Sequence, residues 1–230
     1  MTNLATKVAI GFTVICLSLV GSANLRADSL SSATSRSGFN DTALWPGTCQ
    51  QGLSSVAVSS SNGVTVTATD AGGYIDTDTQ VSPGCSYDGW FGNFTPGDNI
   101  LYTAGNGPIT LTFSSPVSGV GTQFQQNLYG DFTAQIQLYN GATLLGTFTE
   151  AGDSNGNGDN SAIFLGAIDS TGADITSAVF SLTGGVTDFS INDVSLLDGV
   201  VTTPEPGSIV LLGIGLLGLM GMGLRRRRLA

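Results

Sequence analysis

The feature that most constrains the fold is a two-residue alternation of apolar and polar side chains in short segments of the chain. Residues 132–139 read Phe-Thr-Ala-Gln-Ile-Gln-Leu-Tyr, and residues 64–69 and 109–113 follow the same period. Because successive side chains of a strand point to opposite faces, this alternation predicts strands with one buried and one solvated face. No segment between residues 39 and 199 has a helical period of useful length. The sequence therefore predicts an all-β domain.

Turn residues divide this region into many short strands. Asn62-Gly63, which follows the run Val56-Ala57-Val58, predicts a type I′ hairpin, and Asn140-Gly141 predicts a turn into a strand over residues 144–149. Further strands are expected at residues 100–103, 120–125, 162–167, 175–182 and 189–196. About eight to ten short strands with glycine-rich turns favour an antiparallel two-sheet β-sandwich of jelly-roll-like topology.

The N-terminus has the plan of a secretory signal peptide. Lys7 precedes an apolar run over residues 8–20, and the small residues Ala23 and Ala27 offer two cleavage points. We expect a signal helix within residues 1–27, cleaved after Ala23 or Ala27. The serine-rich segment 28–38 has few large apolar side chains and is expected to be a flexible lead-in. Residues 39–199 then form the β-sandwich ectodomain.

The C-terminus holds three signals in a fixed order: Pro204-Glu205-Pro206, an apolar run over residues 209–224, and then Arg225, Arg226, Arg227 and Arg228. The two prolines interrupt regular structure, so residues 200–207 are expected to be an accessible linker. A helix over residues 208–224 would be about 25 Å long, close to the hydrocarbon thickness of a bilayer, and predicts one transmembrane helix. The positive-inside rule places residues 225–230 in the cytoplasm and the ectodomain outside.

This tail resembles the PEP-CTERM sorting tail of bacterial exported proteins. The resemblance implies that exosortase, an integral-membrane cysteine protease, recognises Pro204, Glu205 and Pro206 and processes the membrane anchor. Residues 39–199 also look like the β-sandwich ectodomains commonly joined to such tails, through Phe39-Asn40-Asp41 before Trp45 and through residues 189–194. In that family exosortase systems often accompany exopolysaccharide production. By analogy, extracellular polysaccharide is an expected partner and the cell surface or extracellular matrix the expected destination.

Charge and composition exclude several classes of function. Between Asp28 and Thr203 the chain has one basic residue, Arg36, and sixteen acidic ones, a net charge of −15. Such a surface repels phosphate backbones, so nucleic-acid binding is excluded. The chain has no histidine, and its only lysine lies in the signal peptide. Ser-His-Asp, Cys-His and Schiff-base chemistry therefore have no residues to use, and the protein is not expected to be an enzyme. Cys49 and Cys85 are predicted to form one disulfide in an exported chain.

Residues 153–160 read Asp-Ser-Asn-Gly-Asn-Gly-Asp-Asn, the opening pattern of a calcium loop. A partial calcium site would use Asp153, Asn155, Asn157 and Asp159. Position twelve of the pattern is Phe164 where a glutamate is required, so the segment is not an EF-hand. These residue types are also those of any exposed turn, and a plain loop is the alternative.

Two further motifs suggest sites. The run Trp90-Phe91-Gly92-Asn93-Phe94 forms either a sugar-stacking platform or a buried cluster beside Cys85. The apolar parity of the last strand changes at Asn192-Asp193, which predicts a β-bulge where the Asp193 carboxylate either accepts backbone amides or joins a cation site. Asp76 and Asp78 are expected in a solvated loop.

Together these features favour an exported cell-envelope or extracellular-matrix protein with a non-enzymatic, structural or adhesive role. A calcium-assisted carbohydrate-binding module is the second hypothesis, with calcium as its cofactor. A secreted glycosidase is the third, because glycoside hydrolysis needs only two suitably placed carboxylates.

Overall fold

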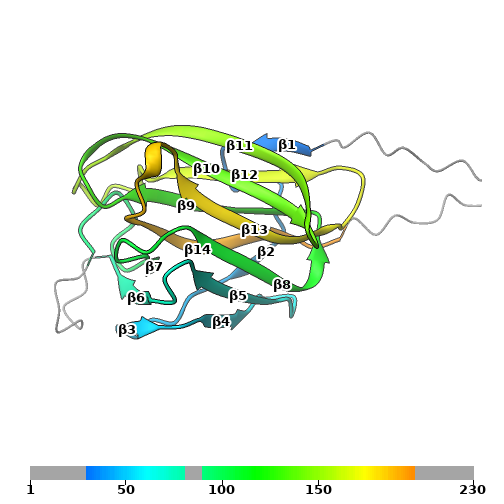
Figure 1. The fold of residues 1–230 in the computed structure, drawn as a ribbon, viewed down its shortest axis with the longest axis horizontal. Coiled ribbons are helices and arrows are strands. Elements are labelled where there is room, and N and C mark those ends of the chain that lie inside the picture. The colour runs from blue at the N-terminus through cyan, green and yellow to red at the C-terminus, as the bar shows by residue number, and fades with distance from the viewer. Residues whose placement is uncertain (1–29, 81–89, 200–230) are drawn as a thin grey trace, which may run out of the picture.

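Fourteen strands in two antiparallel sheets make up the residues that the computed structural model describes, 30–80 and 90–199 (Figure 1). The strands of the first half are β1 (Leu30–Ala33), β2 (Asp41–Ala43), β3 (Gln50–Leu53), β4 (Val56–Ser59), β5 (Thr65–Asp70), β6 (Ile75–Thr79) and β7 (Asn99–Tyr102). Those of the second half are β8 (Ile109–Val117), β9 (Gly119–Gln126), β10 (Gly130–Asn140), β11 (Thr143–Ser154), β12 (Ile163–Asp169), β13 (Ile175–Leu182) and β14 (Phe189–Leu197). A single 3-10 turn, η1 (Thr183–Gly185), precedes β14.

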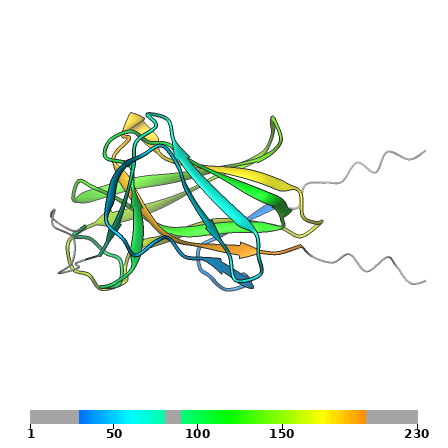
Figure 2. The same ribbon diagram turned by 90° about the horizontal axis from the view of Figure 1, so that it is seen from below.

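The sheets have different sizes. Sheet A has the order β1-β12-β9-β14-β7-β6-β3, with β2 also paired to β14, and sheet B has the order β11-β10-β13-β8-β5-β4. Figure 2 shows the same ribbon from below, with β2 beside the C-terminal part of β14. The predicted all-β, antiparallel two-sheet fold is therefore confirmed.

The last eight strands pair as a nested set. β10 pairs with β11, β9 with β12, β8 with β13 and β7 with β14, and these pairs lie alternately in sheet B and sheet A. A nested set of antiparallel pairs folded over into two sheets is the topology of a jelly roll. The earlier strands widen this unit, because β6 and β3 extend sheet A beyond β7 while β5 and β4 extend sheet B beyond β8.

The core lies between the sheets and follows the alternation in the sequence. On β10, the apolar residues from Phe132 to Leu138 are buried and the intervening polar residues are partly exposed. Phe124 of β9 stacks against Phe189 of β14, with ring centroids 4.5 Å apart. The strands expected at residues 100–103, 120–125, 162–167, 175–182 and 189–196 correspond to β7, β9, β12, β13 and β14 within two residues at each end.

The expected flexible lead-in is wrong for residues 30–33. Leu30 to Ala33 form β1, which pairs with β12 in the register Leu30↔Asp169 to Ala33↔Gly166. Backbone hydrogen bonds of an edge strand need no large apolar side chain, so composition alone hides such a strand. Strands β2 and β3 were missed for the same reason.

Asp76 and Asp78 do not lie in a solvated loop, and that prediction is also wrong. Both belong to β6, where Asp76 is opposite Tyr102 and Asp78 is opposite Ile100 of β7. The side chain of Asp76 is only 7% exposed. Aspartate is a poor strand former, but pairing and burial in a sheet outweigh that weak preference.

The hairpin at Asn62-Gly63 is present, but its turn is wider than a two-residue type I′ turn. β4 and β5 pair as predicted, from Val56↔Ala68 to Ser59↔Thr65. A type I′ turn requires a positive φ at both central residues. Gly63 has a φ of 93°, but Asn62 is not among the residues with positive φ. The Ser60 hydroxyl accepts a hydrogen bond from the Val64 amide at 3.0 Å, which closes the wider loop.

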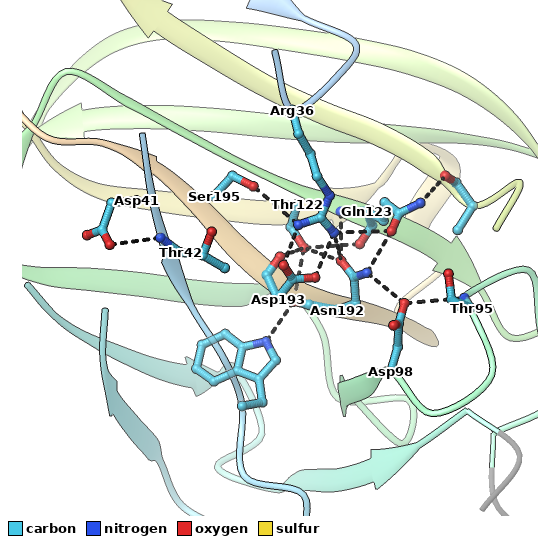
Figure 3. A network of polar contacts seen from close by, with 12 residues as sticks. Arg36, Asp41, Thr42, Thr95, Asp98, Thr122, Gln123, Asn192, Asp193 and Ser195 are labelled. Carbon is cyan, nitrogen blue, oxygen red and sulfur yellow. Dashed lines mark hydrogen bonds and ion pairs between the residues drawn. The ribbon is translucent and has the colours of Figure 1, made fainter. Parts of the chain in front are cut away.

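The predicted bulge in β14 is confirmed and lies where β14 crosses β9. Their register shifts between Ile191 and Val194. The Gln123 amide, which the bulge separates from its ladder partner, donates to Asn192 Oδ1 at 3.1 Å. Asn192 Nδ2 in turn donates to Gln123 Oε1 at 2.7 Å and to Asp98 Oδ2 at 3.1 Å (Figure 3). The Asn192 carbonyl accepts the indole N–H of Trp45 at 2.7 Å.

Arg36 covers this bulge from outside (Figure 3). Its guanidinium forms a two-pronged ion pair with Asp193, with one N–O distance of 2.6 Å. It also donates to Gln123 Oε1 and Asn192 Oδ1, both at 3.2 Å. The expectation that the Asp193 carboxylate accepts backbone amides is therefore wrong. The neighbouring Asn192 has that role because its side chain points into the gap between the strands.

Several predictions fall on residues 1–29, 81–89 and 200–230, which lie outside the described residues. They are the signal peptide over residues 1–27, the linker with Pro204, Glu205 and Pro206, the transmembrane helix over residues 208–224, and the cytoplasmic Arg225, Arg226, Arg227 and Arg228. Cys85 is also outside, so its disulfide with Cys49 stays a prediction. Within residues 30–80 and 90–199, no helix has the length and apolar character needed to cross a bilayer.

We predict that Asn192→Ala lowers the free energy of unfolding by about 2–3 kcal/mol, because it leaves buried polar groups of β9 without partners. Urea unfolding followed by tryptophan fluorescence measures this change, and Asn140→Ala at the exposed end of β10 is the matched control. Equal stability of the two variants would contradict this role of Asn192.

Candidate functional site

A pocket of about 440 Å³ opens on the outer face of sheet A, at the end of the sandwich where β9 turns into β10. Volumes of this size are typical of small-molecule sites. Five of its seven lining residues are aromatic or large and apolar, and four of these five come from two separate loops. The complete lining is Asp78, Trp90, Phe91, Tyr102, Asn127, Leu128 and Tyr129.

The inner wall of this pocket is a packed aromatic cluster. The rings of Trp90 and Tyr102 are tilted against each other with centroids 5.0 Å apart, and Phe94 lies 6.5 Å from Trp90. Trp90, Phe94, Ile100 and Ala162 form a second hydrophobic cluster, separate from the core between the sheets. Because these residues pack on one another, they hold the pocket wall in a fixed shape.

The rim of the pocket is exposed and apolar. Phe91 is 56% exposed, Leu128 68% and Tyr129 61%. The Tyr129 hydroxyl donates to the Phe91 carbonyl at 3.2 Å, which joins the two loops that carry the rim. Large apolar side chains gathered on a surface, in place of polar ones, are typical of a contact site for another molecule.

The loop with the calcium-like sequence supports the aromatic loop. The backbone N–H of Asn155 donates to Asn93 Oδ1 at 2.7 Å, and the backbone N–H of Gly158 donates to the Gly92 carbonyl at 2.8 Å. Asn93 Nδ2 donates to Ser161 Oγ at 2.6 Å. Two motifs that are about 60 residues apart in the sequence are thus hydrogen-bonded to each other. The geometry makes the loop a support for the pocket.

Gly92 is required by the close approach of these elements. A Cβ atom at this position would lie 2.2 Å from Gln125 Oε1 and 2.3 Å from Trp90 Nε1. The Asn93 amide donates to the same Gln125 oxygen at 2.5 Å, so that oxygen is held in place by the loop. A side chain at residue 92 would therefore push the aromatic loop away from β9.

The pocket is acidic as well as aromatic. Burial raises the pKa of Asp78, and the nearby charge of Asp76 raises it further, while amide hydrogen bonds oppose the shift. Burial also raises the pKa of the Tyr102 hydroxyl, with the charge and hydrogen bond of Asp188 adding to it. Asn127 Nδ2 donates to Asp188 Oδ2 at 2.8 Å and to the Tyr102 oxygen at 3.1 Å. Carboxylates thus surround the polar side of the pocket.

The four calcium candidates lie at the end of β11 and in the loop that follows it. Asp153 is in β11, opposite Asp131 of β10. Asn155 Oδ1 accepts the Asn157 amide at 2.9 Å, and Asp159 Oδ1 accepts the Ser161 amide at 3.1 Å. Hydrogen bonds, chiefly from the Ser161 side chain, lower the pKa of Asp159. Across the described part of the chain, no three His, Cys, Asp or Glu residues are grouped to hold a metal ion. Calcium binding at these residues stays a prediction.

The aromatic run has a buried part and an exposed part, and its role as a sugar-stacking platform stays a prediction. Trp90 and Phe94 are buried as core residues, whereas Phe91 is exposed at the rim. Sequence reasoning missed Tyr102, Asn127, Leu128 and Tyr129. A signal was available for two of them, because Leu128 and Tyr129 are large apolar residues in a turn between two strands.

The carboxylates of this face make stability depend on pH. Burial raises the pKa of Asp76, the charge of Asp70 adds to this, and the Gly52 amide, which donates to Asp76 Oδ1 at 2.8 Å, opposes it. The folded protein therefore holds this proton more tightly than the unfolded chain, in which aspartate has a pKa of about 3.9. Stability falls as the pH rises from about 4 through the raised pKa of the folded state.

We predict that Asp76→Asn raises Tm at pH 7 and leaves it nearly unchanged below pH 4, since the amide oxygen can still accept the Gly52 amide. Thermal unfolding between pH 3.5 and 7 measures this. Asp159→Asn is the control of opposite sign, because its lowered pKa predicts a loss of Tm at pH 7. A lower Tm for Asp76→Asn at pH 7 would refute the assignment.

Comparison with known proteins identifies the tail. Residues 202–228 match the model of the PEP-CTERM protein-sorting motif. No curated protein and no solved structure matches the chain. The match confirms that the tail is a PEP-CTERM sorting motif, as the order of Pro204-Glu205-Pro206, the apolar run and the arginines suggested. The chain is therefore a protein with a PEP-CTERM sorting motif, which implies export and processing by exosortase, a membrane enzyme.

Proposed function

We propose that this exported protein has a non-enzymatic, adhesive role in the cell envelope or extracellular matrix, and that it binds extracellular polysaccharide in the pocket around Trp90 and Tyr102. The observation that carries this proposal is the exposed aromatic rim beside polar groups in one concave site. The sorting motif supplies the cellular address but no ligand.

The chemistry of the pocket suits a sugar ring. One face of a pyranose presents C–H bonds with a slight positive charge, which pack against the negative face of an aromatic ring. Its hydroxyl groups need acceptors and donors at the edge. Asp78 and Asn127 line the pocket beside the aromatic residues, and their side-chain oxygens supply acceptors for sugar hydroxyls.

The position of the pocket suits adhesion. Asn127 lies at the edge of the pocket, and its backbone N–H donates a hydrogen bond to the backbone carbonyl of Asp188. Asp188 directly precedes β14. β14 then runs for nine residues to Leu197, which lies opposite Gly119 at the other end of β9. At about 3.3 Å per residue this separates the pocket by roughly 30 Å from the point where the chain leaves sheet A toward the sorting motif. A protein held by its tail would present the pocket outward.

The non-enzymatic part of the proposal rests on the residue types available. The exported region has neither histidine nor lysine, so the acid–base chemistry of a glycosidase would fall chiefly to carboxylates. A glycosidase would use two of these as acid and nucleophile. Asp78 already accepts the Thr79 amide at 2.7 Å, which suits a structural acceptor and a ligand contact better than a proton donor.

We predict that Phe91→Ala and Tyr129→Ala each weaken binding of the full chain to neutral glucans, mannans or galactans at least ten-fold on a glycan array. Tyr74→Ala, at an exposed aromatic residue outside the pocket, is the matched control and keeps the affinity of the original protein. Both rim residues are exposed, so thermal unfolding of the variants stays close to that of the original protein.

Three outcomes would count against parts of this proposal. Absence of binding to every polysaccharide would remove the adhesive role of the pocket. Shortened oligosaccharides after incubation would favour the glycosidase. Loss of binding with a chelator would favour the calcium-assisted module with Asp153, Asn155, Asn157 and Asp159.

A further inference from the structure

Among the described residues, the charged side chains at and beside the pocket are all carboxylates. Arg36 is the only basic residue of the described chain, and it is bound to Asp193 at the β14 bulge. Asp76, Asp78 and Asp188 therefore set the sign of the electrostatic potential around Tyr102, where both Asp76 and Asp188 act on the hydroxyl.

These charges lie in a site with low-dielectric walls. Asp76 is nearly buried, and Asp78 lines the pocket together with Trp90 and Tyr102. Buried and partly buried charges are screened by salt much less than exposed ones. A ligand that enters the pocket therefore meets a concentrated negative field. An anionic group placed there would lose its hydration and gain no cation in exchange.

The same groups suit a neutral ligand. A carboxylate accepts hydrogen bonds from sugar hydroxyls, and such charge-assisted bonds are stronger than neutral ones. The exposed rings of Phe91 and Tyr129 supply contact area that does not depend on charge. A neutral sugar would thus be bound by stacking on the aromatic rings and by its hydroxyl groups donating to the carboxylates. The negative potential of the pocket would discriminate against anionic sugars.

We infer that the pocket selects uncharged pyranose chains and excludes polysaccharides whose sugars carry carboxylates, such as uronic acids. This inference rests on the proposed function of the same pocket and adds the chemical class of its ligand. In an acidic matrix of uronate polymers, the protein would therefore hold only the neutral component.

The test compares matched ligands. Neutral glucan, mannan and galactan hexasaccharides are measured beside counterparts in which the C6 hydroxymethyl groups have been oxidised to carboxylates. Titration of the full chain at 10 mM salt is expected to show at least ten-fold weaker binding of the oxidised forms. Because the pocket carboxylates are buried or partly buried, most of this gap should remain in 0.5 M salt, whereas an effect of the net charge of the chain would disappear there.

Variants assign the effect to the pocket. Asp78→Asn and Asp188→Asn should each narrow the ratio of neutral to oxidised affinity, whichever way the neutral affinity itself changes. Asp198→Asn removes the same charge at the far end of β14 and should leave the ratio unchanged. Equal narrowing in all three variants would show that net charge, and not the pocket, discriminates.

The remaining outcomes separate this inference from the proposed function. Oxidised oligosaccharides that bind as tightly as neutral ones would overturn the selectivity, while polysaccharide binding itself would stand. Binding of neither class would remove both.

Discussion

The bulge of β14 is the constraint on which much of sheet A depends. β14 is central in that sheet and pairs with β9, β7 and β2, so an extra residue in it disturbs several neighbours at once. Unpaired backbone groups inside a protein cost free energy unless another group satisfies them. Asn192 does so from within the bulge, and Trp45 and Thr122 donate to its carbonyl. The bulge is thus an element of the design of the sheet.

The same bulge organises the loops outside sheet A. Asn192 donates to Asp98, whose carboxylate also accepts the Thr95 amide at 3.2 Å. That contact fixes the segment directly after the aromatic run. On the other side, Gln123 donates to Asn160 at 2.9 Å and to the Ala162 carbonyl, next to the loop that supports Gly92 and Asn93. The outer face of sheet A therefore carries a continuous polar network from Arg36 to the loops that shape the pocket.

The sequence was sufficient for the strands whose side chains alternate, because β10 and β13 bury one face against the core. It was not sufficient for β1, β3 and β6, where pairing with a distant strand decides the structure. The bulge was predictable because parity changes at Asn192, but Arg36 lies 157 residues from Asp193 and no local pattern joins them. Only part of the pocket lining could be predicted from local sequence. Trp90 and Phe91 stand out in the sequence, whereas Tyr102 and Tyr129 join them only through the topology.

The direction of β14 has a mechanical consequence. One end of this strand lies beside the pocket, and the other leads the chain out of sheet A toward the sorting motif. Tension between a held ligand and a held tail would pull along the axis of β14, while its ladder hydrogen bonds to β9 are perpendicular to that axis. These hydrogen bonds would therefore be loaded in shear and would resist the tension at the same time. In a strand that is peeled away from its neighbour, the hydrogen bonds break one after another. The clamp of Arg36 on Asp193 lies midway along this line of force.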